Sequence, residues 1–209
     1  MRALDGFLGV CAAAAEGEGV GIGEVLVLGV GKAAAAATLA ARCAVTRPRG
    51  VLLFGVAGAF PPRHGGSPAL APGAVCVVRD DVFGDEGVET PAGFVGIQEL
   101  GLGSVGPFAL SPLAAAVAEA IGAPLVSAVT VSTCSGSDRT SRAMAERSGA
   151  AIETMEGAAV AVVCARFEVP LVHVRAISNW TGDRDRGAWD LARAIAAVQG
   201  AVRRLLGAP

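Results

Sequence analysis

The chain has 209 residues, of which 53% are hydrophobic and 17% charged, and its net charge at pH 7 is −2. A chain of this length can bury a sizeable core, and we expect a single domain over residues 1–209. The near-neutral balance without a basic stripe argues against nucleic acid as a partner. No apolar run reaches the roughly 18 residues needed to cross a bilayer, so no membrane partner is expected.

The cysteines are odd in number and widely spread, without a Cys-x-x-Cys pair: Cys11, Cys43, Cys76, Cys134 and Cys164. This pattern favours reduced, mostly buried thiols in a cytoplasmic protein with no metal site and no cofactor. The first residues also lack the basic and apolar stretches of a signal peptide. Of the two histidines, His173 lies inside an apolar run, and we expect it to be a satisfied core residue.

Apolar runs typical of strands alternate with segments of helical periodicity. The expected strands are Val25–Val30, Val51–Val56, Val75–Phe83, Val126–Ser132 and Leu171–Ile177. The expected helices are Lys32–Val45, Pro112–Ile121, Asp138–Arg147, Met155–Phe167 and Trp189–Leu206. Several of the strands are continuously apolar, which indicates burial on both faces and an α/β domain with helices on both sides of its sheet. Pro61–Pro72 and Gly84–Gly106 are predicted to be long loops or short hairpins.

Two glycine turns follow the first two predicted strands. The first, Gly29–Lys32, opens a helix whose free amides can hold a hydroxyl or an anion, with Gly31 as the candidate residue. The second, Gly55–Ala59, presents backbone at Ala57 and Gly58. Either turn alone is also compatible with a plain connection between elements.

Polar side chains at Glu156 and Asn179 are 23 positions apart, with one helix and one strand between them. This layout can bring both to one rim of an α/β sheet, where small polar ligands bind. A carboxylate at a helix start is also favoured by the helix dipole alone, and Asn at a strand end often forms a turn. A carboxylate can nevertheless accept hydrogen bonds from both adjacent hydroxyls of a ribose.

The segment Asp183-Arg184-Asp185-Arg186, followed by Trp189, is by composition a solvated charged loop. Ser137 or Asp138, at the end of Ser132–Asp138, is first of all a helix cap.

Together, the Thr154-Met155-Glu156-Gly157 run, Asn179 and the two glycine turns resemble the purine nucleosidase and phosphorylase superfamily. Within it, Asn179-x-x-Gly182-x-Arg184-Asp185-Arg186-x-x-Trp189 and the loop from Phe83 to Phe94 resemble the futalosine hydrolase family. The resemblance covers Val25 to Leu191. It implies a three-layer, nucleoside phosphorylase-like fold with a central mixed sheet flanked by helices, and a homodimer or higher homo-oligomer.

The resemblance also assigns roles to residues of the site. Glu156 is expected to hold the ribose hydroxyls and stabilise a ribosyl cation, while Thr154 and Met155 line the sugar. The two turns, at Gly31, Ala57 and Gly58, lie under it. The glycosidic bond of a purine nucleoside then breaks by hydrolysis.

Asn179, where adenine-type enzymes have Asp, favours a 6-oxopurine leaving group, because an amide can donate to the oxo group and accept the purine proton. An Arg, Arg184 or Arg186, is expected to pair with the carboxylate of futalosine, and Phe83 to line its aromatic end or a subunit interface. Two alternatives are a 6-oxopurine nucleoside phosphorylase, disfavoured because Arg and Ser are absent around the second turn, and a nucleoside-binding protein without catalysis.

The start of the chain departs from the family pattern, in which an apolar strand leads to a Glu that orients the attacking water. Residues 2–10 resemble the helix that follows that strand, so we expect the first strand of the sheet to be missing. Glu16, Glu18 and Glu24 are not expected to replace the Glu. Either an upstream start encodes the strand, or catalysis is impaired.

Overall fold

The computed structural model describes residues 4–21, 23–66, 68–183, 185, 187 and 189–207. Its strands are β1 (Phe7–Cys11), β2 (Val25–Val27), β3 (Gly50–Ala59), β4 (Val75–Phe83), β5 (Gly87–Thr90), β6 (Gly93–Gly96), β7 (Phe108–Ala109), β8 (Leu125–Thr130), β9 (Ile152–Thr154) and β10 (Leu171–Trp180). Its helices are α1 (Ala14–Gly17), α2 (Lys32–Val45), the 3-10 turn η2 (Pro62–His64), α3 (Leu113–Ile121), α4 (Asp138–Ser148), α5 (Gly157–Arg166) and α6 (Leu191–Leu206).

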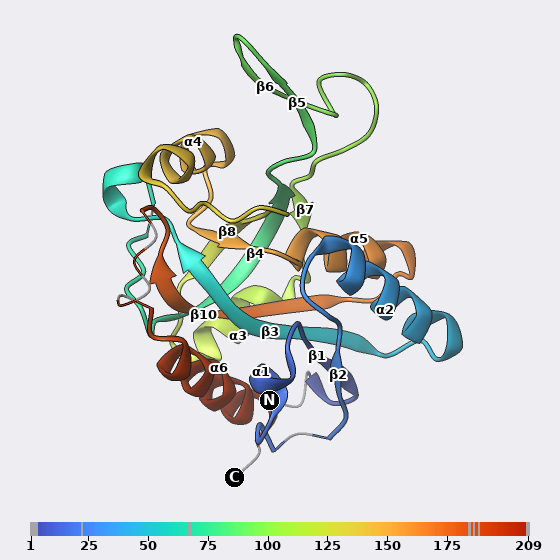
Figure 1. Cartoon of the computed structure of the whole chain (residues 1–209). Helices are drawn as coiled ribbons and strands as arrows, with labels where there is room; N and C mark the ends of the chain where they lie inside the picture. Colours follow the sequence, from blue (N-terminus) through green and yellow to red (C-terminus); the bar gives the residue numbers. More distant parts are fainter. Residues whose placement is uncertain are drawn as a thin grey trace.

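The main sheet is mixed and runs β10-β4-β8-β9-β3-β1-β2, with β7 paired to β4 (Figure 1). Strand β10 pairs in parallel with β3 and antiparallel with β4. Because β9 pairs with both β8 and β3, the five strands β3, β10, β4, β8 and β9 form a closed circuit. The two longest strands, β3 and β10, therefore lie side by side at the centre of the molecule, each protected from solvent along its length.

Two apolar layers cover the sheet, as the continuously apolar strands predict. On one side, Val198 and Val202 of α6 and Val117 of α3 pack against Val172 and Val174 of β10. On the other side, α2 and α5 pack against β1 and β3 through a second cluster of Leu and Val side chains. The prediction of a three-layer α/β fold with a mixed sheet flanked by helices is therefore confirmed.

The prediction that the first strand is missing is wrong. Residues 7–11 form β1, which pairs in parallel with both β2 and β3. The run Phe7-Leu8-Gly9-Val10-Cys11 is a short, continuously apolar segment, and periodicity alone cannot tell such a strand from an apolar helix face. Pairing with two neighbouring strands decides between the two conformations, because it satisfies the backbone of β1 on both edges.

Strands β5 and β6 form a separate antiparallel hairpin that extends away from the body of the molecule (Figure 1). This confirms the hairpin alternative for the segment after Phe83. Four of the cysteines, Cys11, Cys43, Cys76 and Cys164, are free thiols and buried, whereas Cys134 is exposed. No helix in the described ranges is long and apolar enough to cross a membrane. Among the same residues, no group of three or more His, Cys, Asp or Glu side chains could hold a metal ion.

Candidate active site

Glu156 occupies the N-cap position of α5, and only 4% of its surface is exposed. Its Oε1 accepts a hydrogen bond of 3.0 Å from the backbone N–H of Gly31, the residue that opens α2. Gly31 has a φ of 93°, a conformation that favours glycine, and this turn aims its amide at the carboxylate. The structure thus brings together two predicted site residues that are 125 positions apart.

Arg175 of β10 is a candidate site residue that the sequence reasoning missed. Its Nη2 lies 3.2 Å from Glu156 Oε2, and its Nη1 donates a 3.0 Å hydrogen bond to the carbonyl of Val56. The residue is 1% exposed. A guanidinium in an otherwise apolar strand is rare unless it is paired, and that rarity is the sequence signal that could have identified it. The ion pair with Glu156 satisfies both buried charges.

Glu16 contacts the same backbone segment of β3 as Arg175. Its Oε1 accepts 2.9 Å from the N–H of Val56, and its Oε2 accepts 3.0 Å from each of the amides of Ala12 and Ala13. A Cβ at Gly55 would collide with both Glu16 Oε1 and Arg175 Nη1, so these two atoms approach the same Cα. Glu16 and Arg175 therefore meet at the Gly55–Val56 segment, and Arg175 joins this point to Glu156.

The expectation that Glu16 is no substitute for the missing Glu rested on placing it after a helix, and β1 removes that premise. In the structure Glu16 is on the short helix α1, directly after β1, and is 5% exposed. Gln199 of α6 donates to the carbonyls of Ala15, Glu16 and Glu18 and so secures the backbone of α1. The sequence does contain an apolar strand followed by a Glu, but the strand, β1, was too short to be recognised from the sequence.

Behind Glu156 lies a group of fully buried polar side chains. Thr154, a predicted site residue, is within 3.1 Å of the Thr130 hydroxyl, and that hydroxyl donates to Asp81 Oδ1 at 2.9 Å. Burial raises the pKa of the Asp81 carboxyl to about 7. His173 accepts a 2.6 Å hydrogen bond at Nε2 from Arg175 Nε. The ring is buried as predicted, but its Nδ1 has no hydrogen-bond partner among the described residues, so it is only half satisfied.

Asn179 lies near the end of β10, half-buried, where it pairs in register with Gly58 of β3. Its Nδ2 donates 2.9 Å to the carbonyl of Trp180, and the Ser178 hydroxyl lies 2.7 Å from its Oδ1 and 3.2 Å from the carbonyl of Ala57. The structure thus brings Asn179 together with both predicted residues of the second glycine turn. One amide hydrogen and one oxygen lone pair of Asn179 are left for a ligand.

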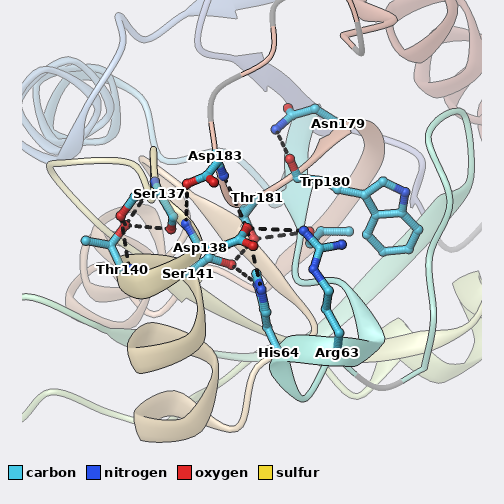
Figure 2. A network of polar contacts seen from close by, with 11 residues as sticks. Arg63, His64, Ser137, Asp138, Thr140, Ser141, Asn179, Trp180, Thr181 and Asp183 are labelled. Carbon is cyan, nitrogen blue, oxygen red and sulfur yellow. Dashed lines mark hydrogen bonds and ion pairs between the residues drawn. The ribbon is translucent and has the colours of Figure 1, made fainter.

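The segment after Asn179 is tied to the start of α4 by a cluster of polar contacts, the Asp138 cluster, which consists of Arg63, His64, Asp138, Ser141, Thr181 and Asp183 (Figure 2). Asp138 Oδ1 accepts 3.1 Å from Arg63 Nη2, and Thr181 and Ser141 share a 2.7 Å contact between hydroxyls. Ser137 caps α4 by accepting from the N–H of Thr140, as predicted. The predicted substrate contacts Arg184 and Arg186 lie outside the described residues.

Phe83, at the end of β4, packs edge-on against Phe108 with 5.4 Å between ring centroids. The ammonium of Lys32 lies 5.1 Å from the Phe83 centroid and 2.7 Å from Asp85 Oδ1. Burial alone lowers the pKa of Lys32, but its hydrogen bonds with Asp85 and Glu86 raise it overall. Lys32 follows Gly31 directly, so it links the first glycine turn to the base of the β5–β6 hairpin.

Met155, the remaining predicted site residue, is half-buried and stands between Thr154 and Glu156, where β9 gives way to α5. The described residues therefore supply two buried carboxylates around one guanidinium, a glycine turn whose amide binds one of them, and an amide side chain farther along the same two strands. Such a set can bind hydroxyls, stabilise a developing positive charge and orient a water molecule.

Comparison with known proteins identifies the protein superfamily that has this architecture. The model of the phosphorylase superfamily matches residues 20–207, and the chain belongs to this superfamily. Among its curated relatives is the futalosine hydrolase of Streptomyces coelicolor, which is 39% identical over 157 residues, corresponding to 74% of this chain and 64% of that protein. The futalosine hydrolase of Thermus thermophilus is 37% identical over 174 residues, 81% of this chain and 73% of that protein. The predicted resemblance is confirmed.

Solved structures share the fold at lower identity. A mutant futalosine hydrolase of Helicobacter pylori superposes with a TM-score of 0.79 at 18% identity, covering 95% of this chain and 96% of that one. A 5′-methylthioadenosine/S-adenosylhomocysteine nucleosidase of Colwellia psychrerythraea, in complex with adenine, has a TM-score of 0.73 at 22% identity and covers 88% of this chain and 76% of that one. The chain spans 64% of the length of the first curated relative, slightly under two thirds.

Proposed function

We propose that this protein hydrolyses the N-ribosidic bond of futalosine and releases hypoxanthine and dehypoxanthine futalosine, a step of menaquinone biosynthesis. The observation that carries the proposal is that Glu16 and Arg175 meet at the Gly55–Val56 segment of β3, and that Arg175 also pairs with Glu156. Relatives also support the proposal, because three curated proteins that are 35–39% identical to this chain are futalosine hydrolases.

In the proposed reaction, the bond between ribose C1′ and purine N9 breaks first and its electron pair leaves with the base. Glu156 accepts hydrogen bonds from the 2′ and 3′ hydroxyls and places negative charge beside the ribosyl cation. The Gly31 amide and Arg175 hold this carboxylate in one orientation, because both of its oxygens are already bound. Thr154 and Met155 line the sugar.

Glu16 is proposed to orient the attacking water and to receive its proton as the oxygen bonds to C1′. Three backbone amides fix the carboxylate: Oε2 accepts from two of them, whereas Oε1 accepts only from Val56 and retains a lone pair for water. This role removes the reason for a non-catalytic binding protein, which depended on a missing Glu.

Asn179 is proposed to recognise the base. Its free amide hydrogen donates to the 6-oxo group, and its carbonyl oxygen accepts a hydrogen bond from the imidazole-ring N–H of hypoxanthine, which forms when the leaving base takes a proton from solvent. A 6-amino group would meet the same amide with a second donor. Mismatched polar groups in a site built for hydrogen bonds can lower specificity constants by about 10⁴-fold. Adenosine-type substrates are therefore expected to be poor.

The outer part of the substrate is proposed to lie towards Phe83, with Arg184 or Arg186 pairing with its carboxylate. We further propose that residues 1–209 form one domain, that the protein acts without a cofactor in the cytoplasm, and that it assembles as a homodimer or higher homo-oligomer. The hairpin β5–β6, which extends from the body, offers a surface for such an assembly (Figure 1).

The function is tested by incubating the purified chain with futalosine, inosine and methylthioadenosine and following the free base by chromatography. Hypoxanthine release from futalosine, faster than release of either other base, is the expected result. Phosphate is varied in the same assay, because a nucleoside phosphorylase requires it and a hydrolase does not. Release that depends on phosphate contradicts the hydrolytic mechanism.

The variant Glu16→Gln tests the water-orienting role. It keeps one oxygen acceptor, turns an amide donor towards the other backbone N–H groups and cannot take a proton, and kcat is expected to fall about 10²–10⁴-fold. Glu24→Gln is the matched control, since Glu24 is a surface carboxylate 3.7 Å from Arg42 and remote from the Gly55–Val56 segment. Equal kcat values for both variants and the unaltered chain would remove Glu16 from the mechanism.

A further inference from the structure

Two buried polar atoms behind the candidate site face each other without a hydrogen bond. They are Asp81 Oδ2 and His173 Nδ1, which are 3.8 Å apart. Both residues have 0% exposed surface. A buried polar atom without a partner costs about 1–3 kcal/mol, so an arrangement in which these two satisfy each other is favoured. That requires a proton on Nδ1 of His173 pointing at the carboxylate.

The hydrogen bond from Arg175 independently requires the same tautomer of His173. Its Nε–H can only donate, and it is 2.6 Å from Nε2 of His173, so Nε2 must be the unprotonated nitrogen. A doubly protonated ring would set two donors against each other. Burial, and secondarily the charge of Arg175, lower the pKa of His173 well below its usual value, in agreement with a neutral ring. The neutral ring then carries its single proton on Nδ1.

The surroundings leave little room for another arrangement. A Cβ at Gly157, the first residue of α5, would collide with both Asp81 and His173, so the helix backbone lies directly against the pair. Thr130 donates to Asp81 Oδ1 and accepts from the N–H of Ala158. The carboxylate is therefore anchored by one hydroxyl on one side and confined by the start of α5 on the other.

We propose that Asp81 and His173 are positioning residues for the reaction: Asp81 selects the Nδ1–H tautomer of His173, and Nε2 of His173 then holds Arg175 against Glu156. The inference rests on the proposed function for the roles of Arg175 and Glu156. Neither Asp81 nor His173 touches the substrate. They act by fixing the rotation of the guanidinium, whose two Nη groups bind Val56 and Glu156.

Steady-state kinetics on futalosine test the positioning. His173→Val removes the acceptor for Arg175, and kcat is expected to fall about 10²-fold with KM changed less than about threefold. His173→Gln restores an acceptor near the Nε2 position and is expected to recover kcat to within about tenfold of the unaltered chain. Val174→Ala is the matched control, because Val174 is buried on the same strand in the cluster of α3 and α6, and its kcat should be unchanged.

The tautomer is measured separately by ¹⁵N NMR of histidine-labelled protein, which has only two histidines, with a His64→Gln variant to assign the signals. At pH 8 the expected spectrum of His173 shows a protonated Nδ1 and an unprotonated Nε2. In Asp81→Asn, the amide donates to Nδ1, and the proton is expected to move to Nε2, against Arg175. The kcat of Asp81→Asn should fall with this change, as it does when the orienting Asp of a catalytic triad becomes Asn.

The proposal is overturned if folded His173→Val retains full kcat, if His173→Gln is as slow as His173→Val, or if His173 carries its proton on Nε2 in the unaltered chain. A loss of kcat in Val174→Ala equal to that in His173→Val assigns the effect to packing and also overturns it. A chain that releases no base from futalosine contradicts the proposed function instead, and the tautomer and its inversion by Asp81→Asn then decide the positioning alone.

Discussion

Two polar networks use the same kinds of side chain in opposite surroundings. The buried network runs from Asp81 through His173 and Arg175 to Glu156, and each of its members is at most 4% exposed. The Asp138 cluster also contains a carboxylate, a histidine and an arginine, but the side chains of Arg63 and Asp138 are 61% and 42% exposed (Figure 2). The burial of the charged groups, not the composition, separates the two networks, since His64, Ser141 and Thr181 of the Asp138 cluster are themselves buried.

This difference decides what each network can do. In the buried network, the charges interact through a medium that screens them weakly. Each contact therefore constrains its neighbour, and Arg175 and the residues behind it fix the orientation of Glu156. In the Asp138 cluster, water competes for each charge, and the contacts mainly tie the segment after Asn179 to the start of α4. The buried network is therefore suited to orienting groups for a reaction, whereas the Asp138 cluster is suited to holding two surface segments together.

The largest contrast is expected on removing one negative charge from each network. Glu156→Gln keeps an oxygen for the Gly31 amide but withdraws charge from the ribosyl cation, so kcat for futalosine should fall about 10³-fold. Asp138→Asn should lower it less than about threefold, because an exposed charge contributes little. Initial rates of hypoxanthine release measure both. Similar losses in the two variants would show that burial does not separate the networks.

The contributions of the two networks to the free energy of unfolding should also change with pH in opposite directions. Burial raises the pKa of Asp81 to about 7 in the folded protein, despite its hydrogen bond from Thr130 and the charge of Arg175, while Asp80 adds to the increase. Stability from this group is present below the unfolded pKa of about 4 and is lost as the pH rises through about 7. The backbone amide of Asp183 lowers the pKa of Asp138, so its contribution is lost only as the pH falls through that lower value.

Denaturant unfolding at pH 5 and pH 8 tests this sign. The unaltered chain should lose about 2–3 kcal/mol more of its free energy of unfolding over this interval than Asp81→Asn does. Asp138→Asn should change with pH as the unaltered chain does. Identical pH dependence of Asp81→Asn and the unaltered chain would mean that Asp81 is ionised throughout the interval.

A glycine beside each network provides a test of packing. Gly157→Ala places a methyl group against Asp81 and His173 and should destabilise the fold by about 1–3 kcal/mol. Gly136→Ala, in the loop before α4 with nothing within 4 Å of the new methyl, should change stability by less than about 0.5 kcal/mol. Thermal or urea unfolding compares them. A tolerated Gly157→Ala would show that the start of α5 can move away from the pair.

The smallest effect is expected for Arg63→Ala in the Asp138 cluster. It removes an exposed ion pair of 3.1 Å, and the slight loss in melting temperature should disappear in about 1 M salt, where the Debye length is about 3 Å. Melting curves at low and high salt measure it. A loss that persists in salt would indicate that Arg63 stabilises the cluster by packing as well as by charge.

Much of the fold could be predicted because its strands are long and apolar. The expected strand Val75–Phe83 and helix Lys32–Val45 match β4 and α2 at both ends. The misses are short elements: β1, whose five residues resemble a helix face, and β9, whose three residues are recognisable only as a bridge between β3 and β8. Local periodicity cannot identify strands of about five residues or fewer, because pairing with distant segments decides them.

By itself, the sequence determined the superfamily and the chemical identity of Glu156 and Asn179, because these depend on side-chain type and on position next to a helix or strand. Only the tertiary structure placed Glu16 next to Arg175 at the Gly55–Val56 segment, and Arg175, His173 and Asp81 behind Glu156. Those relations join β1, β3, β4 and β10, and they arise from sheet pairing and burial between segments far apart in the chain. No local pattern carries that information, since burial is a property of the packed fold.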